Sequence, residues 1–256
     1  MGLENKTAVV TGSATGIGQG VALALAEAGA NITVTYNRDP ADETMELIKK
    51  TGGKALLVKV DTRDRISIRN LFAETYRNFG RIDILINNAA MQLNKLLFDY
   101  KEDEYDWLMD VNIKGYWRCI QEVVPYMKQV SFGRIINIAS VHAKRPTGFD
   151  AIYATTKGGV KMLTREAALA LGKYGITVNT LSPGATIVKP RANKAVVTKT
   201  AAGKELVFHN RPDSGFLSGR HGFPHDMGYY ITFLADERSQ FITGSDIRAD
   251  GGVMLL

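Results

Sequence analysis

The sequence predicts an α/β fold with a doubly wound, mostly parallel sheet of seven strands and helices on both faces. The first observation is that short β-branched segments alternate with amphipathic stretches of helix length, which is typical of βαβ units. The second is that segments such as Ile84-Leu85-Ile86 lack strict polar alternation, as expected for strands buried on both faces. The expected strands are Thr7–Thr11, Ile32–Thr35, Ala55–Val60, Ile82–Ile86, Arg134–Ile138, Thr177–Leu181 and Asp246–Ala249.

Helices are expected between most of these strands, and one long segment is irregular. That segment, 187–223, carries seven lysines and arginines. Because such long segments in compact domains are usually lids or binding loops, we expect a single domain over 1–256 with a substrate lid at about 187–223. The expected helices are Ile17–Ala28, Ala41–Lys50, Asp64–Asn78, Glu102–Lys128, Ala151–Lys173 and Pro224–Ala235.

Composition narrows the class of protein. At 256 residues and 45% hydrophobic, the chain can bury one large core. Its apolar runs are short and no signal-peptide pattern opens it, so we expect a cytoplasmic protein without a membrane partner. The net charge of +6 is spread along the chain with acids interleaved, which favours a phosphate-bearing ligand over nucleic acid. The single cysteine, Cys119, excludes an internal disulfide and is expected to be a buried structural thiol.

A glycine-rich turn follows the first expected strand, with Gly12, Gly16 and Gly18 in the spacing Gly-x-x-x-Gly-x-Gly. Glycines here allow a tight turn, close approach of the backbone to a pyrophosphate and close packing of the next helix. The helix N-terminus favours the phosphate charge. Because the turn lies between a strand and a helix, it predicts a Rossmann-type dinucleotide site that also includes Thr15 and Ile17.

Three further residues predict a proton-transfer site. Tyr153 and Lys157 are four residues apart and therefore share one helix face, roughly 6 Å from each other. A neighbouring ammonium stabilises phenolate and lowers the tyrosine pKa, which would let the phenol exchange protons. Ser140 follows an apolar strand and is expected at the ligand-binding end of the sheet. The alternative is that Tyr153 packs and Lys157 is solvated.

The order of these motifs resembles the short-chain dehydrogenase/reductase family over nearly the full chain. The resemblance rests on the glycine turn, Asp61, Asn87-Asn88-Ala89-Ala90, Asn112, Ser140, Tyr153 with Lys157, and Pro183-Gly184. It implies a catalytic tetrad in which Ser140 and Tyr153 bind the carbonyl oxygen and Tyr153 gives the proton. Lys157 would lower the tyrosine pKa and hold the nicotinamide ribose, and Asn112 would position a water. By itself, Asn112 is more typical of a helix-interior residue with a local hydrogen bond.

The resemblance also implies contacts with the cofactor. Asp61 would bind the adenine amine, although it could instead cap the next helix; Asn88 would lie near the ribose, although it could instead stabilise its own turn. Two residues depart from the family pattern: Ala90 replaces a glycine and Val188 a threonine. The expected cofactor-binding residues are Gly12, Thr15, Gly16, Ile17, Gly18, Asn37, Arg38, Asp61, Thr62, Asn88, Ala89, Tyr153, Lys157, Pro183, Gly184 and Thr186.

Cofactor choice depends on the segment after the second strand. Asp39 is expected to be the N-cap of the next helix, because Pro40 suits the first helical position. Arg38 is then free to pair with a 2′-phosphate, unless it is only a solvated surface cation. NADP is therefore preferred, with NAD possible.

The histidines contribute one candidate. His142 lies two residues after Ser140, so it is expected to contact the substrate together with Ser140 and Tyr153, or to be an ordinary turn residue. A metal site at His221 and His225 with His209 is not expected, because glycine and proline between the first two break a continuous helical face.

These observations predict an NADP-preferring enzyme that interconverts a secondary alcohol and a ketone, with a sugar, polyol or hydroxy acid as the small-molecule substrate. One alternative is a 3-oxoacyl-(carrier protein) reductase, whose acidic carrier would dock on the basic lid. Another is a catalytically silent dinucleotide-sensing or nucleic-acid-binding protein. The resemblance also implies a homodimer or homotetramer assembled through the helices expected at Glu102–Lys128 and Ala151–Lys173.

Overall fold

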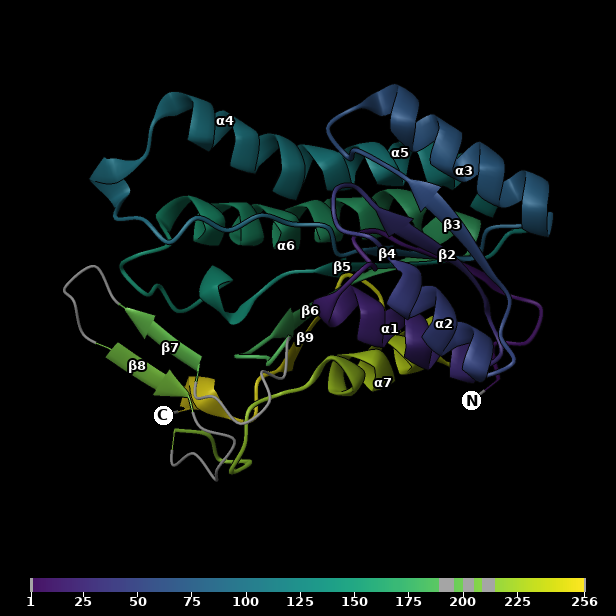
Figure 1. The fold of residues 1–256 in the computed structure, drawn as a ribbon. Coiled ribbons are helices and arrows are strands. Elements are labelled where there is room, and N and C mark those ends of the chain that lie inside the picture. The colour runs from purple at the N-terminus through teal and green to yellow at the C-terminus, as the bar shows by residue number, and fades with distance from the viewer. Residues whose placement is uncertain (1, 189–195, 200–204, 209–214, 256) are drawn as a thin grey trace.

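The computed structural model describes residues 2–188, 196–199, 205–208 and 215–255, and contains one seven-stranded sheet in the order β3-β2-β1-β4-β5-β6-β9 (Figure 1). The predicted fold class is confirmed, and every strand pair in this sheet is parallel. Its strands are β1 (Thr7–Val10), β2 (Asn31–Tyr36), β3 (Ala55–Lys59), β4 (Ile84–Asn87), β5 (Gly133–Ile138), β6 (Ile176–Pro183) and β9 (Asp246–Ala249).

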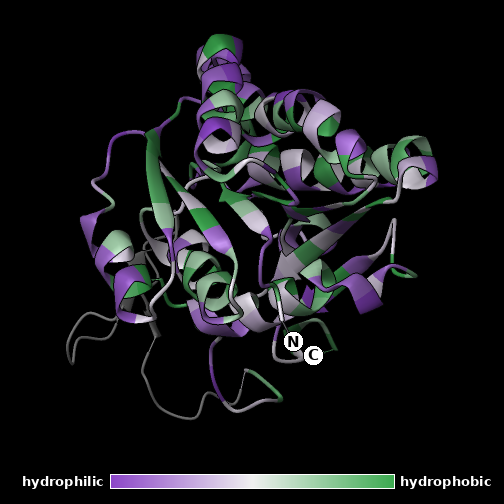
Figure 2. Cartoon of the chain, turned by 90° about the vertical axis from the view of Figure 1, so that its right-hand side faces the viewer, coloured by the Kyte–Doolittle hydropathy of each residue, from purple (hydrophilic) through white to green (hydrophobic). Residues whose placement is uncertain are grey.

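Helices cover both faces of the sheet (Figure 1). One layer contains α1 (Gly16–Glu27), α2 (Asp42–Lys50) and α7 (Pro224–Ala235). The other contains α3 (Arg65–Phe79), α4 (Glu102–Met109), α5 (Gly115–Gln129) and α6 (Ala151–Leu171). Figure 2 shows that the helices around the sheet carry both hydrophobic and hydrophilic residues, as expected for helices that bury one face against a sheet.

Each layer has its own hydrophobic core. Val21 and Leu25 of α1 pack with Ile231 of α7 on one side of the sheet. On the other side, Phe72 of α3 packs with the fully buried Cys119 of α5. Burial raises the pKa of the Cys119 thiol to about 12, which agrees with the structural role predicted for it.

Two details of the predicted helices were wrong. The helix expected at Glu102–Lys128 is interrupted by a π-helical turn, Asp110–Lys114, between α4 and α5. Such turns inside helices often occur at functional sites. Helix α2 begins at Asp42 after Ala41, so Asp39 is not its N-cap.

The segment expected to be irregular contains a short antiparallel hairpin, β7 (Val196–Lys199) and β8 (Glu205–Phe208). Among the described basic residues of this segment, Arg220 pairs with Asp226 at 2.7 and 2.8 Å and is not free to attract a ligand. Five of its basic residues and one histidine lie outside the described residues: Lys189, Arg191, Lys194, Lys204, Arg211 and His209. Across the described ranges, no helix has the length and apolar character needed to cross a membrane.

Candidate active site

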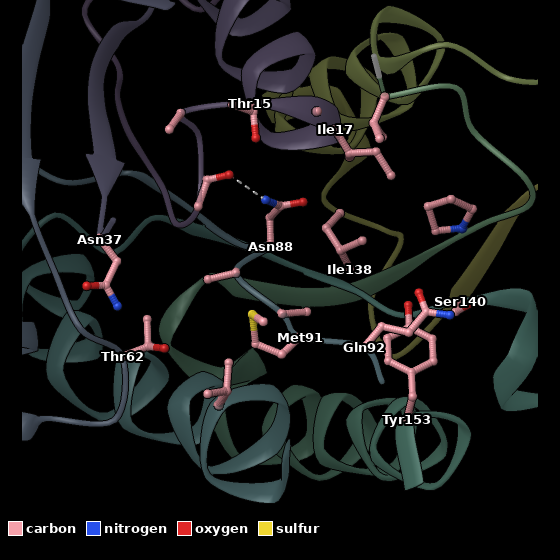
Figure 3. A pocket seen from close by; sticks show the side chains of 18 of the residues that line it. Thr15, Ile17, Asn37, Thr62, Asn88, Met91, Gln92, Ile138, Ser140 and Tyr153 are labelled. Atoms are coloured by element: carbon pink, nitrogen blue, oxygen red, sulfur yellow. Dashed lines mark hydrogen bonds between the residues drawn. The ribbon is translucent and has the colours of Figure 1, made fainter. Parts of the chain in front are cut away.

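A cavity of about 940 Å³ lies at the carboxyl ends of the parallel strands. Figure 3 shows Asn37 and Thr62 at one end and Ser140 and Tyr153 at the other, with Asn88 between them. Two predicted site residues, Gly18 and Asn112, do not line the cavity. Those that line it are Gly12, Thr15, Gly16, Ile17, Asn37, Arg38, Asp61, Thr62, Asn88, Ala89, Ser140, His142, Tyr153, Lys157, Pro183, Gly184 and Thr186.

The glycine turn leaves the N-terminus of α1 open to the cavity. Gly12 and Gly16 have φ angles of 64° and 63°, which other residues rarely adopt. A Cβ atom on Gly12 would lie 2.9 Å from the Cα atom of Ala89, so only glycine lets the turn pack this closely against the segment after β4. The side chain of Thr15 makes no capping hydrogen bond, which leaves amides of the first turn without a side-chain partner. These features fit an anionic pyrophosphate group.

Gly18 and Asn88 support this turn from below. A Cβ atom on Gly18 would lie 2.3 Å from the carbonyl oxygen of Gly12 and 2.6 Å from Nδ2 of Asn88. Nδ2 of Asn88 donates hydrogen bonds to the carbonyl oxygens of Thr11 and Gly12, at 3.0 and 2.9 Å. Asn88 therefore makes the turn-stabilising hydrogen bonds expected as the alternative to cofactor binding, and it also lines the cavity.

Charged side chains of both signs line the Asn37 end of the cavity: Arg38, Asp39, Asp61 and Arg63. Arg38 is exposed and forms no ion pair with any described residue. Asp61 pairs with Arg63 at 2.6 Å, and this contact holds the pKa of the Asp61 carboxyl below its usual value. Asp61 does not cap α3, because Asp64 accepts hydrogen bonds from the amides of Ile66 and Ser67. Arg63 was not identified as a site residue from the sequence. The signal that could have found it is its position two residues after Asp61.

At the other end, Lys157 is buried beneath Tyr153. Its side chain is 1% exposed, so the solvated alternative is wrong. Nζ donates a 2.7 Å hydrogen bond to the carbonyl oxygen of Ile138 and lies 3.3 Å from the hydroxyl of Tyr116. It lies 5.5 Å from the ring centroid of Tyr153, on the same face of α6. Tyr116, one helical turn after Asn112, was not identified from the sequence.

The pKa shifts run opposite to the prediction for the tyrosine. Burial raises the pKa of Tyr153 to about 12, and a hydrogen bond with Ser140 acts in the lowering direction without offsetting it. Burial also lowers the pKa of Lys157 to about 7. Desolvation dominates both shifts, so Tyr153 is protonated at neutral pH.

Asn112 connects three segments from within the π-helical turn. Its Oδ1 accepts a 2.7 Å hydrogen bond from the amide of Met91. Its Nδ2 donates to the Met91 carbonyl oxygen at 2.8 Å and to Oγ1 of Thr156 at 3.1 Å. Because these partners are distant in sequence, the local hydrogen bond considered for Asn112 is wrong. The side chain holds the loop after β4 against α6, and Met91 lines the cavity.

The turn after β6 completes the wall near Tyr153. Pro183, Gly184 and Thr186 line the cavity, and Oγ1 of Thr186 donates a 3.1 Å hydrogen bond to the carbonyl oxygen of Gly184. Val188 also contributes to this wall. Within the described residues, histidine, cysteine and acidic side chains form no group of three or more that could hold a metal ion.

Comparisons with known proteins find similarity over nearly the whole chain. A family model described as enoyl-(acyl carrier protein) reductase matches residues 12–254. The chain is 35% identical to a 3-oxoacyl-[acyl-carrier-protein] reductase of Staphylococcus epidermidis, covering 98% of this chain and 100% of the relative. It is 31% identical to glucose 1-dehydrogenase 2 of Bacillus subtilis, covering 99% and 96%. The crystal structure of a putative short-chain alcohol dehydrogenase from Sinorhizobium meliloti superposes with a TM-score of 0.88 at 30% identity, covering 99% and 98%.

Proposed function

Because the chain belongs to the short-chain dehydrogenase/reductase family, we propose that it is an NADP-preferring oxidoreductase that interconverts a secondary alcohol and a ketone. The observation that carries this proposal is the layout of the cavity. One end offers an uncapped helix N-terminus to a dinucleotide, and the other brings the Ser140 and Tyr153 hydroxyls together above the buried Lys157. A carbonyl placed there lies between a hydride donor and a proton donor.

The residues of the chain supply the proton chemistry. When bound, reduced nicotinamide supplies the hydride that forms the new carbon–hydrogen bond at the carbonyl carbon. Ser140 donates a hydrogen bond to the carbonyl oxygen and stabilises the charge that develops there. Tyr153, protonated at neutral pH, gives its proton to that oxygen and completes the alcohol. Lys157, with a pKa of about 7, can exchange protons near neutrality and is also placed to hold the nicotinamide ribose.

The preference for NADP rests on two arginines at the Asn37 end of the cavity, although Asp39 lines the same end and does not cap α2. Arg38 is exposed and forms no ion pair within the described residues. Arg63 lines the same end of the cavity and is ion-paired with Asp61. A guanidinium is well suited to a 2′-phosphate because it can form two parallel hydrogen bonds.

The proposed substrate class is a sugar, polyol or hydroxy acid, consistent with the name of the B. subtilis relative. The S. epidermidis relative favours 3-oxoacyl reduction as the alternative. Carrier-linked substrates would give turnover with steep salt dependence, whereas free polyols would not. We further propose a homodimer or homotetramer, and a reducing compartment such as the cytoplasm, as the single cysteine predicts.

Removing the Tyr153 hydroxyl tests the reaction directly. Tyr153→Phe should lower the rate of NADPH-dependent carbonyl reduction at least about 1,000-fold, because both the proton and one hydrogen bond to the oxygen are lost. NADPH affinity, measured by fluorescence titration, should change less than about threefold. A wild-type enzyme that binds NADPH but turns over no carbonyl or alcohol would favour the catalytically silent sensing protein.

A further inference from the structure

His142 faces the cavity next to Tyr153 and takes no part in the hydride and proton transfers described above. The side chain of His142 is 27% exposed and lines the cavity. Its ring is nearly perpendicular to that of Tyr153, with the centroids 6.0 Å apart. No described residue forms a hydrogen bond with its Nε2 atom. His142 therefore has one ring nitrogen available to a molecule held by Ser140 and Tyr153.

Behind His142 lies the buried carboxylate of Asp150, which is 2% exposed. Asp150 directly precedes α6, where an aspartate ordinarily accepts a hydrogen bond from amides of the first turn. Its side chain makes no such bond. The carboxylate is therefore held by contacts other than the usual helix cap.

Those contacts are with the histidine and a glutamine. Oδ2 of Asp150 lies 3.4 Å from Nδ1 of His142 and accepts a hydrogen bond from Nε2 of Gln92. Oδ1 of Asp150 and Nδ1 of His142 are both buried without a hydrogen-bond partner in the part of the chain that the structure describes, so the 3.4 Å approach of Oδ2 is an electrostatic contact with a ring nitrogen that nothing else satisfies. Figure 3 shows Gln92 at the same end of the cavity as Ser140 and Tyr153. Three separate segments thus meet beside the reaction centre: the loop after β4, the turn Val141–Ala143 and the start of α6.

The carboxylate determines what His142 can bind. A negative charge next to Nδ1 favours the ring proton on that nitrogen, which leaves Nε2 of the neutral ring as a hydrogen-bond acceptor. An acceptor selects a ligand group that donates, such as a hydroxyl. With ring centroids 6.0 Å apart, this acceptor lies within reach of a group one or two bonds away from a carbonyl held by Tyr153.

We propose that His142, positioned by Asp150, accepts a hydrogen bond from a substrate hydroxyl on the carbon next to the reacting carbonyl. The enzyme then selects α-hydroxy ketones and, in the opposite direction, vicinal diols. This inference rests on the proposed function. A 3-oxoacyl thioester has no hydroxyl at that carbon and would leave the acceptor unpaired.

The test compares two ketones that differ only in that hydroxyl, 3-hydroxy-2-butanone and 2-butanone, in NADPH-dependent reduction. Wild type should favour the hydroxy ketone about 10- to 100-fold in kcat/KM. His142→Leu should lower kcat/KM for 3-hydroxy-2-butanone to the level of 2-butanone, whose own value stays unchanged. Asp150→Asn should act in the same direction through the histidine, whereas the exposed neighbour Lys144→Met should leave both values unchanged.

A binding measurement gives a readout that does not need turnover. Trp107 lines the cavity, so its fluorescence reports ligands that enter it. In the complex with NADP, 2,3-butanediol should bind wild type at least about tenfold more tightly than 2-butanol, and this difference should vanish in His142→Leu.

Four outcomes separate the inference from the proposed function. Equal kcat/KM for the two ketones in wild type, or an equal loss for both in His142→Leu, would overturn the inference and leave the oxidoreductase intact. Reduction of 3-oxoacyl thioesters with no turnover of hydroxy ketones would do the same. If no carbonyl is reduced, the proposed function fails, and equal affinity for diol and mono-alcohol then overturns the inference as well.

Discussion

Burial sets the proton affinities of the residues nearest the reaction centre. Tyr153 and Lys157 are both shifted toward their neutral forms, which places the lysine pKa at about 7 and keeps the tyrosine protonated. Burial also raises the pKa of Tyr116 well above its usual value, so its hydroxyl stays neutral beside the lysine. The Tyr116 hydroxyl and the carbonyl oxygen of Ile138 are the two oxygen neighbours that make a buried ammonium tolerable below pH 7.

The lysine shift predicts a pH-dependent stability. Between pH 7 and 10.5 the unfolded chain keeps the Lys157 proton and the folded chain does not, so this residue makes stability rise with pH. Lys157→Met removes the effect. Its unfolding free energy relative to wild type should therefore fall by about 2 to 3 kcal/mol from pH 6 to pH 9, measured by urea unfolding. The exposed Lys49→Met serves as control and should show a constant difference; a constant difference for Lys157→Met as well would contradict the shift.

Arg38 carries the prediction for cofactor choice. Arg38→Ala should weaken NADPH binding about 10- to 100-fold, because it removes a charge-assisted contact with the 2′-phosphate. NADH affinity should change by less than about twofold. Both dissociation constants can be measured by nicotinamide fluorescence, and an equal loss for the two cofactors would refute the assignment.

At the scale of elements, close contacts between helices fix the floor of the cofactor site. Helix α1 begins at the glycine turn and packs directly on α7. A Cβ atom on Gly20 would lie 2.5 Å from the carbonyl carbon of Pro224, and one on Gly228 would lie 2.9 Å from the carbonyl oxygen of Gly20. The two helices therefore approach each other at backbone distance, which anchors the end of the 187–223 segment beside the turn that faces the pyrophosphate.

Substitution by alanine should have opposite effects at two helical glycines, one at the crossing of α1 and α7 and one in α6. Gly20→Ala should destabilise the protein by about 1 to 3 kcal/mol, because the contacting atoms belong to the backbone and rigid ring of Pro224 and cannot move without separating the helices. Gly158 in α6 has no atom within 4 Å of a Cβ position, so Gly158→Ala should stabilise by about 0.5 to 1 kcal/mol through helix propensity alone. Urea unfolding at one fixed protein concentration measures both. Stabilisation by Gly20→Ala would show that α1 and α7 are not held this closely.

At the scale of the whole molecule, the regular parts followed from sequence patterns and the exceptions depended on contacts distant in sequence. Most of the seven strands are rich in β-branched and other apolar residues and are separated by amphipathic stretches of helix length, so their pairing into a parallel sheet was predictable. The π-helical turn around Asn112 was not, because its neighbours keep a helical pattern and only the contacts with Met91 and Thr156 distinguish it. Asp150 looks like an ordinary helix cap in sequence, whereas its carboxylate faces His142 and Gln92.

The outer faces of the helices predict that the chain assembles. Met162 and Leu169 of α6 are 53% and 81% exposed and lie two helical turns apart on one face, where apolar side chains gain stability only if covered. We expect a mass of two or four times 28.1 kDa by light scattering. The double variant Met162→Glu with Leu169→Glu should halve that mass, because two charges cannot be buried against a symmetric partner. Phe241→Glu changes an equally apolar residue, 98% exposed, outside α6 and should leave the mass unchanged. A wild-type mass of a single chain, or an unchanged mass in the double variant, would show that this face of α6 does not form the interface.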